Sequence, residues 1–316
     1  MIKPMAPTPP IPRRTRRRCC WYSSLSGFFA IFIVFAMFLS VCLGFNGPKI
    51  NSASLYLLPV DLLVAGRDDP AGSNMARRLL PRMEGDGDLH RGGSYDLLMV
   101  DGPAVSAGWI GGSYEYDGYV FLSRHAAASG RLALTCHSLG NFAGAPLGGR
   151  PREVGVPHPQ LQKAYMGALA ARAGSFAGFH ITIEATHHGP TELDRPAAFV
   201  EVGTTERQWN DEALCGAVAD VLHGCMGGGG DAPVAICFGG GHYPEKFTKM
   251  AVSGRYALGT VVPRRALADV DGEVFAHIVR RNEGASAALL DWSGMGPERG
   301  RILGMAESAG LEVVRV

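Results

Sequence analysis

Short apolar runs rich in β-branched residues alternate with longer amphipathic stretches along this chain, from about Leu55 to its last residue. The runs have the length and composition of buried strands, and the stretches between them have helical periodicity. The alternation predicts an α/β fold in which a mixed, mostly parallel sheet is flanked by helices on both faces. No internal repeat or heptad pattern points to another architecture.

The same pattern gives the expected elements. Strands are predicted at residues 60–65, 96–100, 119–122, 132–136, 181–185, 198–202, 234–238, 259–262, 287–291 and 312–316. Helices are predicted at residues 74–80, 160–173, 206–222, 275–281 and 297–309. Because a chain of 316 residues can bury a large core, we expect residues 60–316 to form one domain.

The amino-terminal residues have a different composition. Residues 1–26 form a basic segment, and the 19 residues at 27–45 have no charge and one clearly polar side chain, Ser40. About 20 apolar residues span a bilayer as a helix, so we predict a transmembrane or signal-anchor helix at 27–45 and a linker at 46–59. Small residues at Cys42 and Gly44 also permit cleavage by a signal peptidase, and a buried core helix is the third interpretation.

Charge is distributed unevenly along the chain. Residues 1–49 hold seven Lys and Arg residues and no acidic residue, so the remainder has 23 basic against 29 acidic residues. A domain that wraps duplex nucleic acid normally has a basic excess, which argues against extensive phosphate binding. The cysteines show no C-x-x-C spacing, and we expect a reduced interior without a disulfide framework.

Five of the ten histidines lie at or after the ends of predicted strands, where open α/β sheets place their functional sites. They are His125, His137, His187, His188 and His242. Neutral imidazoles from several loops are suited to bind zinc. Side chains of consecutive strand residues point to opposite faces, so His187 and His188 cannot both face the core. The alternative for this pair is a core histidine bonded to a carbonyl group beside a surface histidine.

Two further features accompany the histidines. Gly239, Gly240 and Gly241 separate a buried strand from His242, and they allow the backbone to approach a ligand or to offer N–H groups to an anion. Glu201 lies between two valines in a predicted strand and is either a solvated surface residue or an inward partner of the histidines. Sequence motifs of serine hydrolases, P-loop nucleotide hydrolases, zincins and dinucleotide-binding proteins are absent.

Six segments resemble the D-aminoacyl-tRNA deacylases of the archaeal and plant type. They are SRHAAASG (123–130), LTCHSLGNF (134–142), EATHHGPTEL (184–193), FVEVGTTERQW (199–209), FGGGHYPEKFT (238–248) and ALLDWSGM (288–295). The resemblance extends from about Val60 to Val316. It implies a zinc-dependent hydrolase that cleaves the ester bond of D-aminoacyl-tRNA, releasing free D-amino acid and tRNA, and so removes D-amino acids from translation.

The resemblance also implies an α/β fold related to peptidyl-tRNA hydrolases and phosphorylases, with residues 60–316 as the catalytic domain. The 3′ end of aminoacyl-tRNA is the expected partner, and we expect a monomer without a nucleotide cofactor. A metal-activated or histidine-oriented water is sufficient to attack an activated aminoacyl ester.

We assign roles within this site as predictions. Catalytic roles are predicted for His187, His188 and Glu201; metal binding for His125, His137 and His242; and substrate binding for Gly239, Gly240, Gly241 and Tyr243. Two alternative functions remain. One is a metallohydrolase or phosphorylase that acts on a free nucleoside or acyl ester and binds phosphate at the three glycines. The other is a membrane-tethered binding module, which leaves the histidines unexplained.

The amino-terminal residues also predict a location. The basic run before residues 27–45 stays on the cytosolic side, which carries the remaining chain across the membrane. Charged tRNA occurs where translation takes place. We therefore predict a membrane-associated protein or one delivered to a translating organelle, and a cytoplasmic protein if the mature chain lacks this segment.

Overall fold

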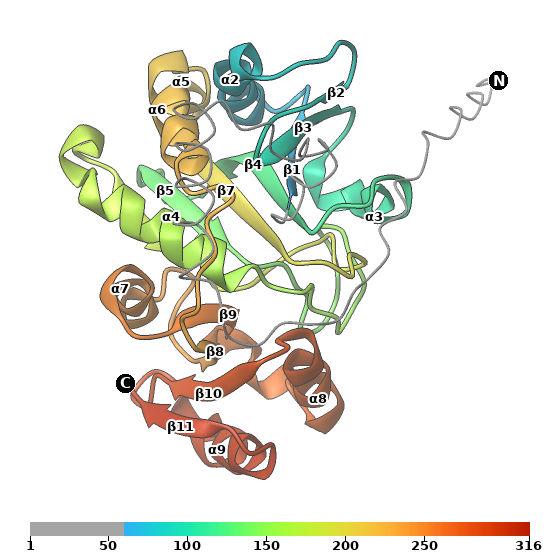
Figure 1. Ribbon diagram of the computed structural model, residues 1–316. Helices are drawn as coiled ribbons and strands as arrows, with labels where there is room; N and C mark the ends of the chain where they lie inside the picture. The colour runs from blue at the N-terminus through green and yellow to red at the C-terminus, as the bar shows by residue number, and fades with distance from the viewer. Residues whose placement is uncertain (1–59) are drawn as a thin grey trace, which may run out of the picture. The chain divides into compact units, whose positions relative to one another are not determined.

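The computed structural model describes residues 60–316, which form two β-sheets with helices between them and on their outer faces (Figure 1). The first sheet has seven strands in the order β2-β3-β1-β4-β7-β5-β6, and the second has four in the order β11-β10-β8-β9. The predicted α/β class with a mixed, largely parallel sheet flanked by helices is confirmed.

The strands have the following bounds. Those of the first sheet are β1 (Asp61–Gly66), β2 (Leu89–His90), β3 (Tyr95–Val100), β4 (Gly118–Ala126), β5 (Ala133–His137), β6 (His180–Ile183) and β7 (Ala197–Thr204). Those of the second are β8 (Val234–Phe238), β9 (Ala257–Val262), β10 (Ala285–Leu290) and β11 (Glu312–Arg315). All neighbouring strands are parallel except β2 with β3 and β5 with β7.

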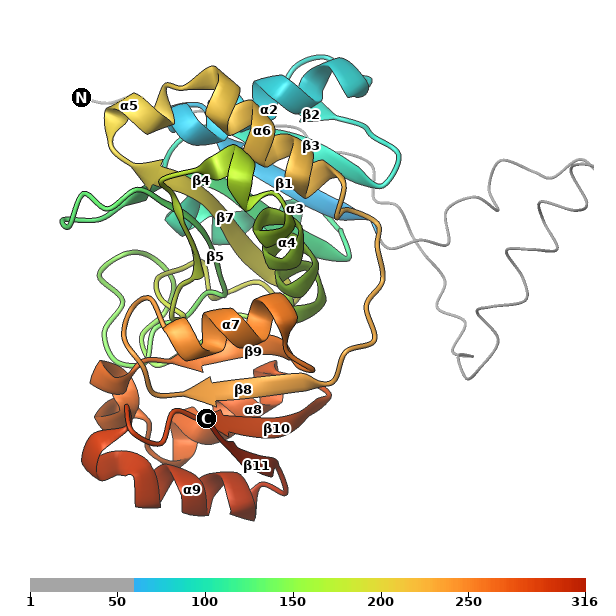
Figure 2. The same cartoon turned by 90° about the vertical axis from the view of Figure 1, so that its left-hand side faces the viewer.

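The α-helices are α2 (Pro70–Leu79), α3 (Ile110–Ser113), α4 (Pro159–Ala171), α5 (Glu206–Trp209), α6 (Glu212–His223), α7 (Glu245–Ser253), α8 (Gly272–Arg281) and α9 (Arg299–Ser308). Figure 2 shows α4 and α7 between the two sheets and α8 and α9 beyond the second sheet. Each strand of the second sheet is joined to the next by one of the helices α7, α8 and α9, as parallel strands require.

The two faces of each sheet belong to different cores. In the first sheet, Leu122 and Val200 pack in the core that contains α2, α4 and α6, whereas Phe121 and Phe199 stack on the opposite face with ring centroids 4.7 Å apart. Alternation along β8 sends Cys237 to the core that also contains α4 and α7, and Phe238 to the core under α8 and α9.

Two of the predicted elements differ in the structure. The helix predicted at residues 206–222 is two helices, because Asp211 has extended backbone angles and its carboxylate accepts the Leu214 N–H group, so α6 starts anew. The strand predicted at 181–185 ends at Ile183. After it, the backbone N–H of Ala185 donates to the His242 carbonyl group, next to the second sheet.

The predictions for the amino-terminal segment have a different outcome. Residues 1–59, which include the predicted helix at 27–45 and the linker at 46–59, lie outside the described residues. Among residues 60–316 no helix is both long and apolar enough to cross a membrane. The predicted membrane-associated or organellar location is corrected accordingly, because the described part of the chain provides no membrane-spanning helix to support it.

Candidate active site

The strand register places three polar side chains on one face of the first sheet. Glu201 in β7 lies opposite Thr135 of β5, and His137 lies opposite Phe199 two residues earlier. On the other side of β7, His125 of β4 lies opposite Gly203. Because side chains two residues apart in a strand share a face, Glu201, His125 and His137 point to the same side. Of the two interpretations of Glu201, the structure shows the inward one.

Gly203 makes room for the His125 side chain. A Cβ atom at this position would lie 2.6 Å from His125 Cβ and 2.8 Å from Cδ2 of its ring. No side chain fits within that space without displacing the imidazole. The absence of a Cβ atom at residue 203 therefore determines where the His125 ring can lie.

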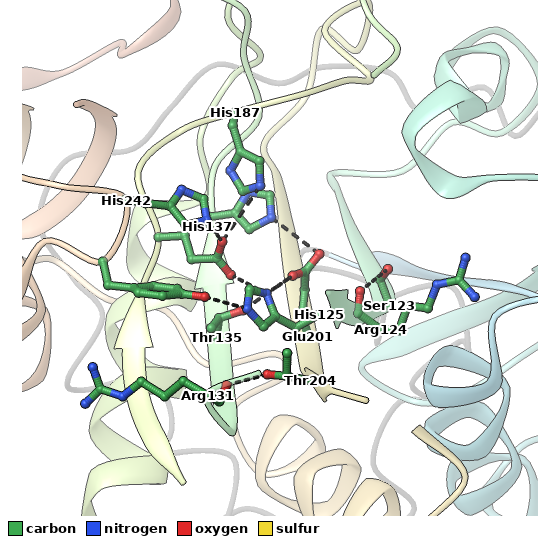
Figure 3. A network of polar contacts seen from close by, with 12 residues as sticks. Ser123, Arg124, His125, Arg131, Thr135, His137, His187, Glu201, Thr204 and His242 are labelled. Carbon is green, nitrogen blue, oxygen red and sulfur yellow. Dashed lines mark hydrogen bonds and ion pairs between the residues drawn. The ribbon is translucent and has the colours of Figure 1, made fainter. Parts of the chain in front are cut away.

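Glu184 lies at the centre of the histidines, although it was not among the site residues predicted from the sequence. Its side chain is fully buried, with His242 Nε2 at 2.7 Å and His187 Nε2 at 3.8 Å from Oε2, and His125 Nδ1 at 3.0 Å from Oε1. Figure 3 shows these three histidines close together. Despite this proximity, neither carboxylate oxygen has a hydrogen bond of good geometry. The sequence indicates only that an acidic residue after an apolar run needs a partner if it is buried; it does not show that the histidines surround this one.

Two carboxylates surround His125. Its Nδ1 lies 3.1 Å from Glu201 Oε2 and 3.0 Å from Glu184 Oε1. Burial lowers the pKa of His125, but the two carboxylates outweigh it and raise the pKa to about 10. Burial alone would favour the protonated form of Glu201, yet His125 and His137 lower its pKa to about 2. His125 is therefore an imidazolium ion at neutral pH, held by two carboxylates.

Three other histidines pack ring against ring. The centroids of His137 and His187 are 4.2 Å apart, and His188 lies 4.9 Å from His137 and 4.4 Å from His187. Each Nδ1 lies 2.8–3.0 Å from a backbone carbonyl oxygen, of Ser138, Ala185 or Gly189. A carbonyl oxygen only accepts, so each Nδ1 carries the proton and each Nε2 of a neutral ring keeps its lone pair.

Burial keeps two of these rings neutral. It lowers the pKa of His188 to about 4 and that of His187 well below the ordinary value, and the nearby His137 adds to both shifts. In His137, Glu201 outweighs burial and raises the pKa. His188 is buried with its Nδ1 on the Gly189 carbonyl oxygen, whereas His187 is partly exposed. The pair therefore matches the alternative interpretation, in which a buried histidine bonded to a carbonyl group lies beside a more exposed one.

The cluster can accommodate a metal ion. Among residues 60–316, three groups bring their ligand atoms within 4.8 Å of one another: His137 with His187 and His188, Glu184 with His187 and His242, and His125 with Glu184 and Glu201. His137 Nε2 is buried without a hydrogen-bond partner, which suits an atom that binds a cation. These imidazole and carboxylate donors match zinc chemistry.

The predicted metal ligands do not lie together in one group, and Glu201 does not contact the predicted catalytic pair. His125, His137 and His242, predicted to share a metal, fall into three different groups of this kind. Glu201 contacts His125 and His137 rather than the predicted catalytic pair. The assigned roles therefore remain predictions.

The predicted substrate-binding residues lie where β8 ends. Gly239 and Gly240 have φ angles of +107° and +77°, which glycine adopts without strain, and a Cβ atom on Gly239 would lie 3.0 Å from both Asp291 Cβ and Met295 Cγ. Gly241 has open space on its Cβ side. Tyr243 places its hydroxyl group 2.7 Å from His125 Nε2. Of the four residues, Tyr243 contacts the cluster directly.

Comparison with known proteins identifies the family. Residues 113–314 match a family model described as D-aminoacyl-tRNA deacylase. A protein of Cenarchaeum symbiosum with the name D-aminoacyl-tRNA deacylase is 60% identical over 256 residues, which cover 81% of this chain and 99% of that protein. The chain belongs to the D-aminoacyl-tRNA deacylase family.

More distant proteins match a similar share of the chain. A D-aminoacyl-tRNA deacylase of Korarchaeum cryptofilum is 34% identical over 261 residues and matches 80% of this chain and 92% of its own. A crystal structure described as a conserved protein of unknown function is 27% identical, with a TM-score of 0.76 over 81% of this chain and 95% of its own. This chain and that crystallised protein therefore share a fold over most of their length.

Proposed function

We propose that residues 60–316 are the catalytic domain of a hydrolase that cleaves the ester bond of D-aminoacyl-tRNA, releasing free D-amino acid and tRNA. One observation carries this proposal: the family match at residues 113–314 contains every member of the buried cluster. These members are His125, His137, Glu184, His187, His188, Glu201, His242 and Tyr243. A hydrolase of this kind would remove D-amino acids from the translation machinery.

We infer that zinc is the metal and that His137, His187 and His188 hold it. Three imidazoles with their Nδ1 protons on carbonyl oxygens resemble the three-histidine sets that bind catalytic zinc. When bound, zinc supplies a Lewis acid that polarises the ester carbonyl group and makes water more acidic. Glu201 Oε1 lies 3.5 Å from His137 Nε2 and adds a negative charge that favours a cation at this place.

The chain's own residues supply positive charge and hydrogen bonds. Glu184 and Glu201 hold His125 as an imidazolium ion, and its Nε2–H donates to the Tyr243 oxygen. The Tyr243 hydroxyl proton is then free to donate to an oxygen atom of the substrate. Hydrogen-bond donors fixed in advance at the oxygen where negative charge develops are a major source of rate acceleration in ester hydrolysis.

The phosphorylase alternative has less support. It requires the turn at Gly239, Gly240 and Gly241 to bind a phosphate group. Asp291 Oδ2 lies 3.7 Å from where a Cβ atom on Gly240 would be, so a carboxylate faces this turn. A negative charge there opposes phosphate binding, although Lys246 pairs with the same carboxylate at 2.7 Å.

The relationship to peptidyl-tRNA hydrolases and phosphorylases also remains a proposal. The mostly parallel seven-stranded sheet flanked by helices supports it. Superposing an experimental structure of this chain on members of both families would test it.

The activity is tested with chirally matched substrates. The full chain is incubated with D-tyrosyl-tRNA and with L-tyrosyl-tRNA, and released amino acid is measured over time. We expect hydrolysis of the D-ester at a rate well above both the uncatalysed rate and the rate for the L-ester. Equal rates for the two esters, or none above background, would contradict the proposal.

A further inference from the structure

Two exposed arginines flank the cluster near the end of β4. Arg124 directly precedes His125, and Arg131 lies in the loop that joins β4 to β5. Within residues 60–316 neither guanidinium group forms an ion pair. Figure 3 shows the two side chains on opposite sides of His125, both directed away from the buried cluster. They offer unpaired positive charge on both sides of the site.

The Arg124 guanidinium group lies over the ring of Trp209, and the Trp209 indole is hydrogen-bonded to the backbone of His125. The guanidinium carbon lies 5.3 Å from the centroid of the Trp209 ring, and Trp209 Nε1 donates to the His125 carbonyl oxygen at 3.0 Å. The Trp209 carbonyl oxygen accepts from Nδ2 of the buried Asn74 at 2.9 Å. The indole is therefore hydrogen-bonded to the strand that carries His125, the backbone of Trp209 is bonded to Asn74, and the residue remains partly exposed.

Arg131 lies on the side of the cluster where Tyr243 is found. Burial lowers the pKa of His180, and the Arg131 charge lowers it further. The His180 ring packs edge-on against Tyr243 with centroids 5.8 Å apart. The positive charge of Arg131 therefore acts on a histidine that packs against Tyr243, the residue that contacts His125.

A single-stranded RNA end suits this combination. Proteins bind unpaired RNA with guanidinium groups on its phosphates and with aromatic rings on which its bases stack. Residues 50–316 carry a net negative charge, with 23 basic and 29 acidic residues, so an RNA substrate must rely on local cations. Arg124 and His125 are consecutive in β4 and face opposite sides of the sheet, so the RNA would pass over the end of this strand.

We propose that Arg124, Arg131 and Trp209 form the surface that receives the single-stranded 3′ end of the tRNA substrate, with the arginines on its phosphates and the indole against one of its bases. This proposal rests on the proposed function and adds to it the place where the RNA is bound. The surface positions the ester at the cluster and takes no part in the bond cleavage.

The test measures KM for D-tyrosyl-tRNA at several salt concentrations with Arg124→Ala, Arg131→Ala and the double variant. Removing one arginine–phosphate interaction should raise KM several-fold at low salt and lower the slope of log KM against log salt by about 0.7, with kcat nearly unchanged. Arg255→Ala is the matched control, because Arg255 is exposed, lies 5.1 Å from the Tyr256 ring centroid and has no ion pair in the described part of the chain.

Two further measurements separate this proposal from the proposed function. D-tyrosyl-adenosine has the ester but no phosphate, so the wild type and the arginine variants should hydrolyse it equally. Trp209→Ala should weaken binding of a short single-stranded RNA about tenfold or more, with thermal unfolding recorded to confirm the fold. A wild type inactive on D-aminoacyl-tRNA would refute the function. An active wild type with unchanged KM and salt slope in the double arginine variant would refute this surface alone.

Discussion

The Tyr243 hydroxyl group lies 2.7 Å from His125 Nε2, although His125 is in the first sheet and Tyr243 is in a loop that follows a strand of the second. His125 is near the end of β4 in the first sheet, and Tyr243 follows β8 in the second. A histidine held by carboxylates on one side is thereby bound on its other side by a tyrosine from the loop after β8. The cluster depends on how the two sheets pack, so small changes of volume near it should affect activity.

Replacing Gly203 with alanine should displace the His125 ring. The new Cβ atom would lie 2.6 Å from His125 Cβ, and overpacking of this kind costs about 1–3 kcal/mol of stability. Hydrolysis of D-tyrosyl-tRNA per folded molecule should fall strongly, because the ring loses its place between the carboxylates. Gly304→Ala in α9 is the control, since its Cβ atom meets nothing within 4 Å. Full activity in a stable Gly203→Ala variant would show that the position of this ring is unimportant.

The metal-free protein should lose stability as the pH falls, because of His188. Its pKa is about 4 in the folded chain and about 6.5 when exposed. Between pH 6.5 and pH 4, His188 is therefore protonated in the unfolded chain and neutral in the folded chain. Stability from this group is therefore complete above pH 6.5 and is lost toward pH 4. The loss amounts to about 1.5 kcal/mol between pH 6.5 and 5, because the slope reaches ~1.4 kcal/mol for each pH unit only once the unfolded histidine is mostly protonated.

Urea unfolding of the wild type and His188→Asn, both in chelator, tests this pH dependence. His188 has a φ angle of +44°, which asparagine tolerates, and an asparagine side chain can also donate to the Gly189 carbonyl group. The variant cannot bind this proton, so its stability should fall less between pH 6.5 and 5. Equal losses in the two proteins would contradict the assigned pKa.

Among the glycines before His242, Gly239 should affect the stability of the fold, whereas Gly241 should affect substrate binding. Gly239→Ala should lower thermal stability, because the residue has a φ angle of +107° and its Cβ atom would lie 3.0 Å from Asp291 Cβ. Gly241→Ala meets open space and should leave stability unchanged while raising KM if this residue contacts substrate. Unchanged KM together with unchanged stability in Gly241→Ala would remove it from the substrate-binding residues.

Zinc content should follow the three packed histidines. The purified protein should contain zinc, and removing it with a chelator should reduce hydrolysis until zinc is added back. His188→Asn should bind zinc more weakly, as measured by metal content after dialysis. His158→Gln is the control, because His158 lies 3.3 Å from Asp61 and belongs to none of the metal-binding groups in the described chain. A metal-free protein with full activity would exclude a role for zinc.

The sequence predicted the elements of the fold better than their arrangement. The strand predicted at 234–238 is β8 with the same bounds, because a strand buried along nearly all its length forms an unbroken apolar run. The division into two sheets was not predicted, because one sheet and two sheets can both be built from the same alternation of strands and helices along the sequence. Helix α7 was missed because it has only nine residues, so its apolar set at Phe247, Met250 and Ala251 covers a single helical repeat, which is too short to separate a helix from a loop.

The candidate site was predictable where residue type and strand alternation decide the geometry. The histidines at strand ends and Glu201 could be selected because their positions relative to apolar runs are visible in the sequence. The central position of Glu184 could not, since it depends on the chain leaving β6 at Ile183 and on Ala185 bonding to the distant His242. Long-range backbone contacts of this kind leave no local pattern.

Turnover of D-tyrosyl-tRNA by Glu184→Gln tests most directly whether the buried cluster is the active site. Glutamine keeps the volume of the side chain but removes the charge that His125 and His242 approach, and this loss should reduce kcat by about 10²–10⁴. Glu212→Gln is the matched control, because Glu212 is exposed in an ion pair with Arg77 and should keep wild-type activity. A folded Glu184→Gln variant that hydrolyses D-tyrosyl-tRNA at the wild-type rate would contradict the assignment of the buried cluster as the active site.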